Sequence, residues 1–294
     1  MVTVVLYTVG GSLTATTRRG LQSAGPRSGI CFIHITNSQV SFSAADGSAY
    51  QMGMFHVFDY ARRHGHAYLR VMDTSGSSHL HGVWAKPKHL SRALREYEIV
   101  VLMDMDLYIP DPTIPFTFLL DRWGFNQSTL VLQAMDPDLK PRNYITDKNG
   151  SEVLMANTGF VVLRSHPKVM RLLDQWYHCR DTTYGAEHCG GYNFTGSLNQ
   201  PPWNLLVRPQ LNASEHIIVP CEEANGYPET FGDKNHGCVG KYIWHPWFHK
   251  DKVQQVLADL IDVGQREQLL AELVHGDHLR FWLDPPPLPW AADS

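Results

Sequence analysis

The sequence lacks the features by which several classes of protein are recognised. Its 294 residues carry a formal net charge of −4, so no concentrated basic surface is expected and nucleic acid is not an expected partner. No window approaches the roughly 20 apolar residues needed to cross a bilayer. The N-terminal apolar run, residues 2–9, is interrupted by Gly10 and Gly11, so we expect no transmembrane segment in this chain.

Targeting and zinc-binding patterns are missing as well. No basic residue precedes the N-terminal run, which makes it a poor signal peptide: either it is a strand, or the targeting region is missing. The five cysteines contain no C-x-x-C spacing, which argues against a zinc ribbon. They are Cys31, Cys179, Cys189, Cys221 and Cys238.

Four Asn-x-Ser/Thr sequons are present, each in a polar or turn-rich stretch that could carry a surface glycan. They begin at Asn126, Asn149, Asn193 and Asn212. Together with four cysteines in the C-terminal half, they predict life in the lumen of the secretory pathway, with one or two disulfides. The alternative is chance sequons and buried free thiols.

Composition and patterning predict one α/β domain. With 43% hydrophobic residues, the chain can form one sizeable core. We expect a strand or linker over residues 1–29, a single domain over 30–275 and a proline-rich arm over 276–294. Apolar runs and periodicity predict strands at 30–36, 67–72, 99–103, 130–134 and 160–163, and helices at 50–64, 84–97, 167–177 and 252–274. The alternation predicts a mostly parallel sheet flanked by helices, with an irregular region after Cys179.

Two carboxylates follow the most apolar of these strands. Asp104 and Asp106 are two residues apart, so they leave the carboxyl end of the strand on one side, where open α/β sheets bind ligands. Carboxylates this close repel one another unless a cation lies between them, and hard oxygen ligands suit Mg²⁺ or Mn²⁺. One alternative is a pair of acids that caps a loop or pairs with Lys or Arg. Another is an aspartate-nucleophile phosphatase. Tyr108 argues against it, because the phosphatase motif places Thr or Val at this position.

An ordered set of motifs resembles one known family. Tyr60-Ala-x-x-His64-Gly, Trp84-Ala-Lys86, the strand into Asp104-x-Asp106, and Asn157-Thr-Gly159-Phe-Val-Val-Leu-Arg164 followed by a Leu-Leu-Asp-x-Trp helix occur in this order. The set looks like the galactosyl-, mannosyl- and xylosyltransferases of glycosyltransferase family thirty-four, over roughly residues 30–250.

This resemblance implies a GT-A fold, a UDP- or GDP-sugar donor and a glycan or glycoprotein acceptor. It also implies Mn²⁺ held by Asp104 and Asp106, and retention of the anomeric configuration. Such relatives are typically Golgi proteins with an N-terminal membrane anchor, which this chain does not contain. A divalent cation suits this chemistry because it stabilises the charge that develops on a diphosphate leaving group.

In the family, a late histidine completes the metal site, and a lysine five residues later contacts the diphosphate. His245 and Lys250 have this spacing, and so do His236 and Lys241. We prefer His245, because the short apolar run 242–244 would deliver it to the site.

The chain departs from the family at Asn199 and Gln200, where an Asp-Gln pair is usual. An amide cannot act as a nucleophile, so double displacement through this position is in doubt, whereas a front-face mechanism survives. Asp136 is a further candidate for contacting the sugar or acceptor. The departure also keeps a second hypothesis open, a catalytically silent nucleotide-sugar or glycan-binding domain; a metal-dependent phosphohydrolase is the third.

Further residues are candidates for the donor pocket. Thr36, Asn37 and Ser38 end the first strand, and Asn157 and Gly159 precede a later one. Lys86 either reaches the diphosphate or is a solvated helix lysine.

Overall fold

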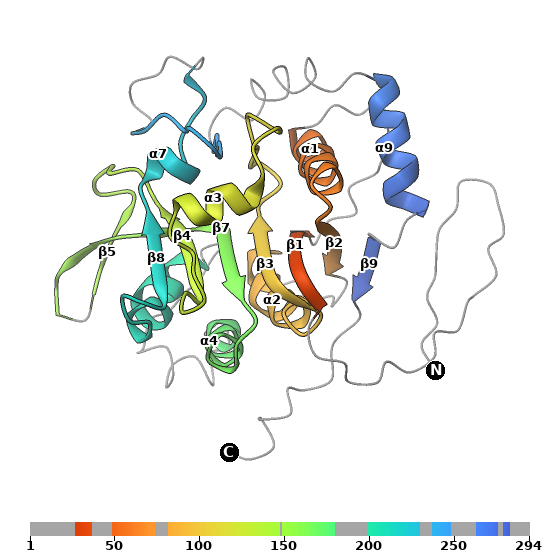
Figure 1. The fold of residues 1–294 in the computed structure, drawn as a ribbon. Helices are drawn as coiled ribbons and strands as arrows, with labels where there is room; N and C mark the ends of the chain where they lie inside the picture. Colours follow the sequence, from red (N-terminus) through yellow and green to blue (C-terminus); the bar gives the residue numbers. More distant parts are fainter. Residues whose placement is uncertain are drawn as a thin grey trace.

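The structure is a computed structural model that describes the chain in eight stretches, and every statement below concerns these residues. They are residues 27–36, 49–73, 82–147, 149–179, 199–229, 237–247, 263–275 and 279–282. Figure 1 shows one central sheet with helices on both sides of it.

The central sheet has seven strands in the order β8-β4-β7-β3-β1-β2-β9. β7 pairs antiparallel with both of its neighbours, β3 and β4, and the remaining pairs are parallel. A separate antiparallel hairpin is formed by β5 and β6. The strands are β1 Arg27–Thr36, β2 Ala67–Asp73, β3 Tyr97–Met103, β4 Val131–Met135, β5 Tyr144–Thr146, β6 Glu152–Leu154, β7 Ala156–Arg164, β8 His216–Val219 and β9 Leu279–Trp282.

Helices connect the strands and cover the sheet. The α-helices are α1 Ala49–Arg63, α2 Lys86–Ala93, α3 Phe116–Arg122, α4 Pro167–His178, α6 Gln200–Pro202, α7 Cys221–Ala224 and α9 Val263–His275. Single turns of other helix types are η1 Gly82–Ala85, η2 Trp203–Val207 and η3 Arg208–Gln210. None of these helices is long and apolar enough to span a membrane.

Alternation along the strands builds two cores, one on each face of the sheet. On β3, Val101 and Met103 pack with residues of α1, α3 and α9, whereas Val100 and Leu102 pack with residues of α2 and α4. β3 is therefore buried on both faces, as its unbroken apolar run predicts. The predicted α/β fold with a mostly parallel sheet flanked by helices is confirmed.

Three predictions, including a short strand over residues 242–244, differ from the structure. The helix expected over residues 84–97 ends at Ala93, because Tyr97 pairs with Arg27 as the first residue of β3, and sheet pairing overrides the helical spacing. The chain after Cys179 is less irregular than expected, since β8 pairs with β4 at the edge of the central sheet. The run 242–244 is not a strand but contains isolated bridges at Trp244.

Other expectations lie wholly or partly outside the described residues. The N-terminal run and residues 252–262 are not described, while the remainder of the last predicted helix forms α9. Residues 279–282, within the expected C-terminal arm, form β9 beside β2.

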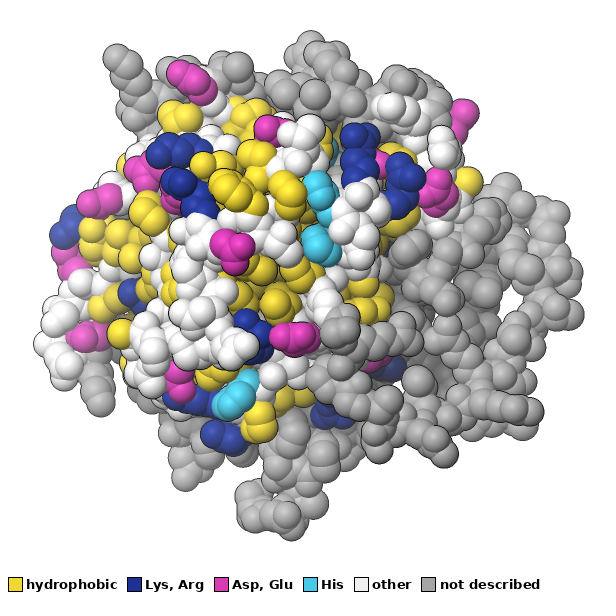
Figure 2. All heavy atoms as spheres, in the orientation of Figure 1, with side chains coloured by type: hydrophobic (Ala, Val, Ile, Leu, Met, Phe, Trp, Pro, Cys, Tyr) yellow, Lys and Arg dark blue, Asp and Glu magenta, His cyan; other side chains and the backbone are white. Residues whose placement is uncertain are grey.

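The face drawn in Figure 2 mixes basic, acidic and hydrophobic side chains. The described residues on this face form no continuous field of one charge.

α1 packs directly on the loop that follows β3. A Cβ atom added to Gly53 would overlap the main-chain oxygen of Met105 and lie 3.0 Å from Cε1 of Tyr108. Glycine is therefore required in the middle of this helix for a close approach of two backbones. The helix thereby fixes the loop that carries Asp104 and Asp106.

We expect Gly53→Ala to destabilise the protein by about 1–3 kcal/mol, as overpacking does. A glycine-to-alanine change inside a helix otherwise stabilises by roughly 0.5–1 kcal/mol, so the two effects have opposite signs. Urea unfolding measures the difference. Gly65→Ala shows the cost of backbone strain without overpacking: none of the described atoms lies within 4 Å of its added Cβ, and its positive φ of 69° alone should cost about 1–2 kcal/mol. A stabilised Gly53→Ala variant would contradict the close approach.

Candidate metal centre

The sheet places the two aspartates at the carboxyl end of β3. The main-chain nitrogen of Asp104 donates to the oxygen of Gly159 at 2.8 Å, which closes the ladder between β3 and β7. A tight turn follows, in which the nitrogen of Leu107 donates to the oxygen of Asp104 at 2.9 Å. Asp106 lies within this turn and is largely buried.

His245 reaches the same place through a backbone bridge. Tyr108 and Trp244 exchange two main-chain hydrogen bonds, of 3.0 and 2.9 Å. The next residue, His245, is buried, and its Nε2 lies 3.5 Å from Oδ1 of Asp106. One potential ligand atom from each of Asp104, Asp106 and His245 lies within 4.8 Å of the others.

Lys86, at the start of α2, joins this group. Its Nζ lies 2.7 and 2.8 Å from the two carboxylate oxygens of Asp104 and 3.3 Å from the main-chain oxygen of Thr158. Only 4% of the residue is exposed, so the expectation of a solvated helix lysine is wrong. The alternative of an acid paired with a basic residue does hold for Asp104. Asp104 and Asp106 thus bring two carboxyl groups together beside the single amino group of Lys86.

Burial controls the ionisation of this site. It raises the pKa of Asp104, while Lys86 opposes the shift and Asp106 adds to it.

Burial also lowers the pKa of His34, on β1, to about 3, so this imidazole is neutral near pH 7. Nδ1 of His34 lies 2.8 Å from the hydroxyl oxygen of Tyr68.

The donor set and the space between its members fit a divalent cation. Two carboxylates and an imidazole are ligands that Mn²⁺ and Mg²⁺ tolerate, with the nitrogen favouring the transition metal. A Cβ on Gly159 would lie 2.8 Å from Cε1 of His245 and 2.9 Å from Oδ2 of Asp104. Glycine at this position therefore lets the ligand side chains converge.

A buried carboxylate lies beside the metal centre. Oδ1 of Asp136 accepts from Nδ2 of Asn157 at 2.9 Å and from Nδ2 of Asn225 at 3.1 Å, and Oδ2 accepts from Nε2 of Gln200. Burial raises the pKa of Asp136, and these three amides oppose the shift. Both oxygens are therefore occupied by amide donors from different segments.

Asn199 and Gln200 contact Thr158, in the first half of β7. Oδ1 of Asn199 lies 3.4 Å from Oγ1 of Thr158, and Oε1 of Gln200 accepts from the nitrogen of Thr158 at 3.2 Å. Asn157 folds back so that its Oδ1 accepts from the nitrogen of Gly159 at 2.6 Å. The fold thus brings Thr158 against two residues that lie 41 and 42 positions later in the chain.

The remaining predicted residues are placed only in part. Thr36 is buried at the end of β1. Asn37, Ser38, His236 and Lys250 lie outside the described residues. Lys241 is exposed, with its Nζ 4.0 Å from a carboxylate oxygen of Glu223.

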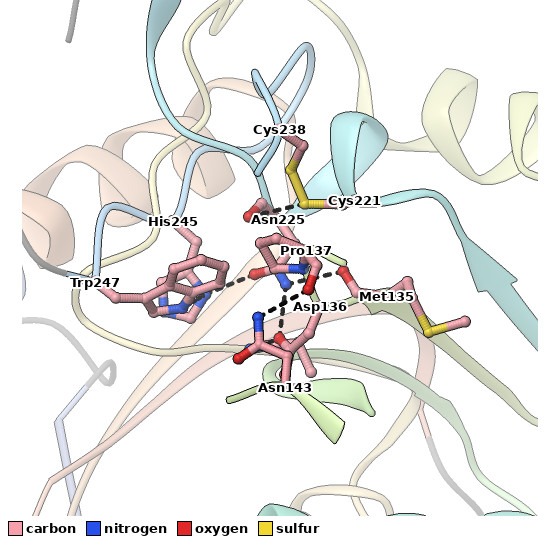
Figure 3. Close-up of a disulfide and its surroundings, with 10 residues drawn as sticks. Met135, Asp136, Pro137, Asn143, Cys221, Asn225, Cys238, His245 and Trp247 are labelled. Carbon is pink, nitrogen blue, oxygen red and sulfur yellow. Dashed lines mark hydrogen bonds between the residues drawn. A yellow bond between two sulfur atoms is a disulfide. The ribbon is translucent and has the colours of Figure 1, made fainter. Parts of the chain in front are cut away.

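Sequence reasoning missed Asn225, which connects His245 to Asp136. It follows α7 and stands next to no recognisable motif, so only the fold reveals it. Figure 3 shows it between Met135, Asp136 and His245, close to the Cys221–Cys238 disulfide. Cys179 is also disulfide-bonded, and Cys31 is a buried thiol that takes part in none of the described disulfides.

We expect Gly159→Ala to weaken Mn²⁺ binding by about tenfold or more. Tenfold is the lower end of the loss in metal affinity that follows when the surroundings of metal ligands are changed. The added methyl group would displace the side chains of Asp104 and His245. Isothermal titration with MnCl₂ measures the loss. Gly150→Ala, whose added Cβ has no neighbour within 4 Å in the part of the chain that the structure describes, should leave Mn²⁺ binding unchanged. Equal affinities for the wild type and Gly159→Ala would show that the cation does not bind between these ligands.

No protein-family profile matches the sequence, and no curated protein does. Solved structures do resemble it. A glycosyltransferase involved in the glycosylation of the major capsid of PBCV-1 superposes with a TM-score of 0.55, at 11% identity, over 78% of this chain and 98% of the other. Mouse xyloside xylosyltransferase 1, in its apo form, gives a TM-score of 0.48 at 9% identity, over 76% and 99%. The first likeness shows that this chain has the fold of a glycosyltransferase.

Proposed function

We propose that the chain is a metal-dependent glycosyltransferase. It transfers a hexose or pentose from a UDP- or GDP-sugar to a hydroxyl group of a glycan or glycoprotein, with retention. The observation that carries the proposal is the convergence of Asp104, Asp106 and His245 at the carboxyl edge of a sheet. The fold shared with a glycosyltransferase supports it.

The charge of the site suits an anionic donor once a cation is present. A bound Mn²⁺ or Mg²⁺ would supply a Lewis acid for the charge of the leaving diphosphate. Asp104, Asp106 and His245 would hold it. Lys86, already within 2.8 Å of Asp104, adds an ammonium group beside the same position. Lysine is a common partner of phosphate groups, so it orients the donor by charge.

The residues near the expected reaction centre favour a front-face mechanism. Asn199 carries an amide and cannot attack the anomeric carbon. Asp136 is buried, and both of its oxygens accept hydrogen bonds, so it is a poor nucleophile. We propose that Asp136 and Gln200 position the donor site, and that the leaving phosphate accepts the proton of the acceptor.

The donor pocket is proposed from position in the fold. Thr36 ends β1, next to β3 in the sheet, and Asn157 and Gly159 lie on β7. Asn37, Ser38 and Lys250 are included on the resemblance alone.

We propose the lumen of the secretory pathway, including the Golgi, as the compartment. The Cys221–Cys238 disulfide supports an oxidising environment. The sequon residues Asn126, Asn149 and Asn212 are exposed. Each is therefore accessible for a glycan.

A second candidate function is nucleotide-sugar binding without transfer. Asn199 favours it, because the amide stands where the resembling family has a carboxylate. Binding alone does not separate the two functions, whereas turnover does.

The proposal is tested first by thermal unfolding with UDP, GDP and their common sugar conjugates, with and without MnCl₂. A ligand that binds the native state at 100 times its Kd stabilises it by about 2.7 kcal/mol, so the midpoint should rise. We expect a Mn²⁺-dependent rise with one of the two diphosphates and release of that diphosphate from its sugar conjugate when an acceptor is added. Absence of any rise would overturn the proposal, and a rise without turnover would favour the silent binding domain.

Asp104→Asn and Asp106→Asn should abolish the Mn²⁺-dependent rise and turnover while the protein stays folded. Glu152→Gln, which alters an exposed ion pair with Lys140 in the β5–β6 hairpin, is the matched control and should behave as the wild type. Full activity of either aspartate variant would refute the metal assignment.

A further inference from the structure

Asn225 is fully buried, and hydrogen bonds at both ends of its side-chain amide determine which way the amide faces. Its Nδ2 lies 3.0 Å from the main-chain oxygen of Met135 and 3.1 Å from Oδ1 of Asp136. A main-chain carbonyl can only accept, so the amide nitrogen must face it. The amide oxygen consequently faces His245, with Oδ1 2.8 Å from Nδ1.

This orientation determines where His245 carries its proton. An amide oxygen only accepts, so Nδ1 of His245 must donate to Asn225. In a neutral imidazole, the lone pair then lies on Nε2. Nε2 is the nitrogen that lies 3.5 Å from Oδ1 of Asp106, on the side of the proposed cation.

Trp247 opposes this arrangement. Its Nε1 lies 2.8 Å from the same Nδ1 of His245, and an indole N–H can only donate. Trp247 alone would therefore favour the other tautomer, with the proton on Nε2. Nδ1 of His245 cannot donate to Asn225 and accept from Trp247 at once. The amide nitrogen of Asn225 is held by two acceptors, so the bond to Asn225 determines the tautomer (Figure 3).

We propose that Asn225 is a positioning residue that keeps His245 in the Nδ1–H tautomer and leaves Nε2 available to a cation. The inference deepens the proposed function and rests on its metal site. Metal-binding histidines commonly donate their second N–H to a fixed acceptor, which sets both tautomer and ring orientation. In this chain, the acceptor is an amide that also contacts the Asp136 carboxylate.

Main-chain hydrogen bonds hold the segments of Asn225 and His245 together. The nitrogen of His245 donates to the oxygen of Gly226 at 2.9 Å, and the nitrogen of Asn225 donates to the oxygen of Cys221 at 2.8 Å. The Cys221–Cys238 disulfide joins the two segments at the other end. Main-chain contacts thus hold the backbones of the two residues close together, which allows the amide and the imidazole to meet at 2.8 Å.

The tautomer can be read directly in the metal-free protein. Long-range ¹H–¹⁵N NMR of the full chain with ¹⁵N-labelled histidine, at about pH 8 where an ordinary histidine is neutral, separates the protonated from the unprotonated ring nitrogen. The signal that disappears in His245→Gln identifies the residue. We expect the wild type to carry its proton on Nδ1 and Asn225→Ala to carry it on Nε2. A wild type protonated on Nε2, or an unchanged tautomer in Asn225→Ala, would overturn the proposal whether or not the protein is a transferase.

Mn²⁺ affinity provides the second readout, by titration of the wild type and variants with MnCl₂. Asn225→Ala should bind Mn²⁺ about 10- to 100-fold more weakly. Adding Trp247→Phe should recover part of the loss, because it removes the donor that selects the wrong tautomer. Asn143→Ala is the matched control, since Nδ2 of Asn143 donates to the oxygen of Pro137 at 2.8 Å without contacting His245. If Asn225→Ala and Asn143→Ala weaken binding equally, or if Trp247→Phe recovers nothing, Asn225 acts only through general packing and the proposal fails.

Discussion

The site depends on one pair of backbone hydrogen bonds, those between Tyr108 and Trp244. Asp106 belongs to a turn that β3 positions, whereas His245 comes from a late segment that contributes no strand to the central sheet. The bridge brings the segment that carries His245 onto the turn that carries Asp106, and the bonds of His245 to Gly226 and Asn225 then orient the imidazole. Because the bonds join main-chain atoms, they do not depend directly on the chemistry of the two side chains. Tyr108 itself is fully buried in the core.

Glycines let the backbones around this bridge approach closely. Gly53 admits the loop after β3 to the surface of α1, and Gly159 leaves space between the ligand side chains. A Cβ on Gly226 would overlap main-chain atoms of Gly240, in the segment that leads to His245. At each of these three positions, separate segments of the chain therefore meet where a side chain is missing. A continuous series of contacts also links Asp104 to His245 at the candidate metal centre. It passes in turn through Lys86, Thr158, Gln200, Asp136 and Asn225.

The sequence allowed prediction of whatever is encoded locally. An unbroken apolar run made β3 predictable, and the spacing of Asp104 and Asp106 predicted two carboxylates together at its carboxyl end, where they lie close to His245. β8 was missed because four residues, His216–Val219, carry too little pattern, and their pairing with β4 is a long-range property. The helix predicted through Tyr97 was too long because pairing with β1 determines where β3 begins. Asn225 lacks a local signature altogether, since its role arises from partners on two distant segments, Met135 with Asp136 and His245.

The ion pair between Lys86 and Asp104 has a consequence for how far the fold depends on a cation. In many small metalloproteins the cation is part of the fold, and its removal unfolds the chain. Here Lys86 already lies against the carboxylate of Asp104, and Asn225 already contacts the imidazole of His245, so these side chains are in place without an ion. A chelator should therefore leave this protein folded, in contrast to those metalloproteins.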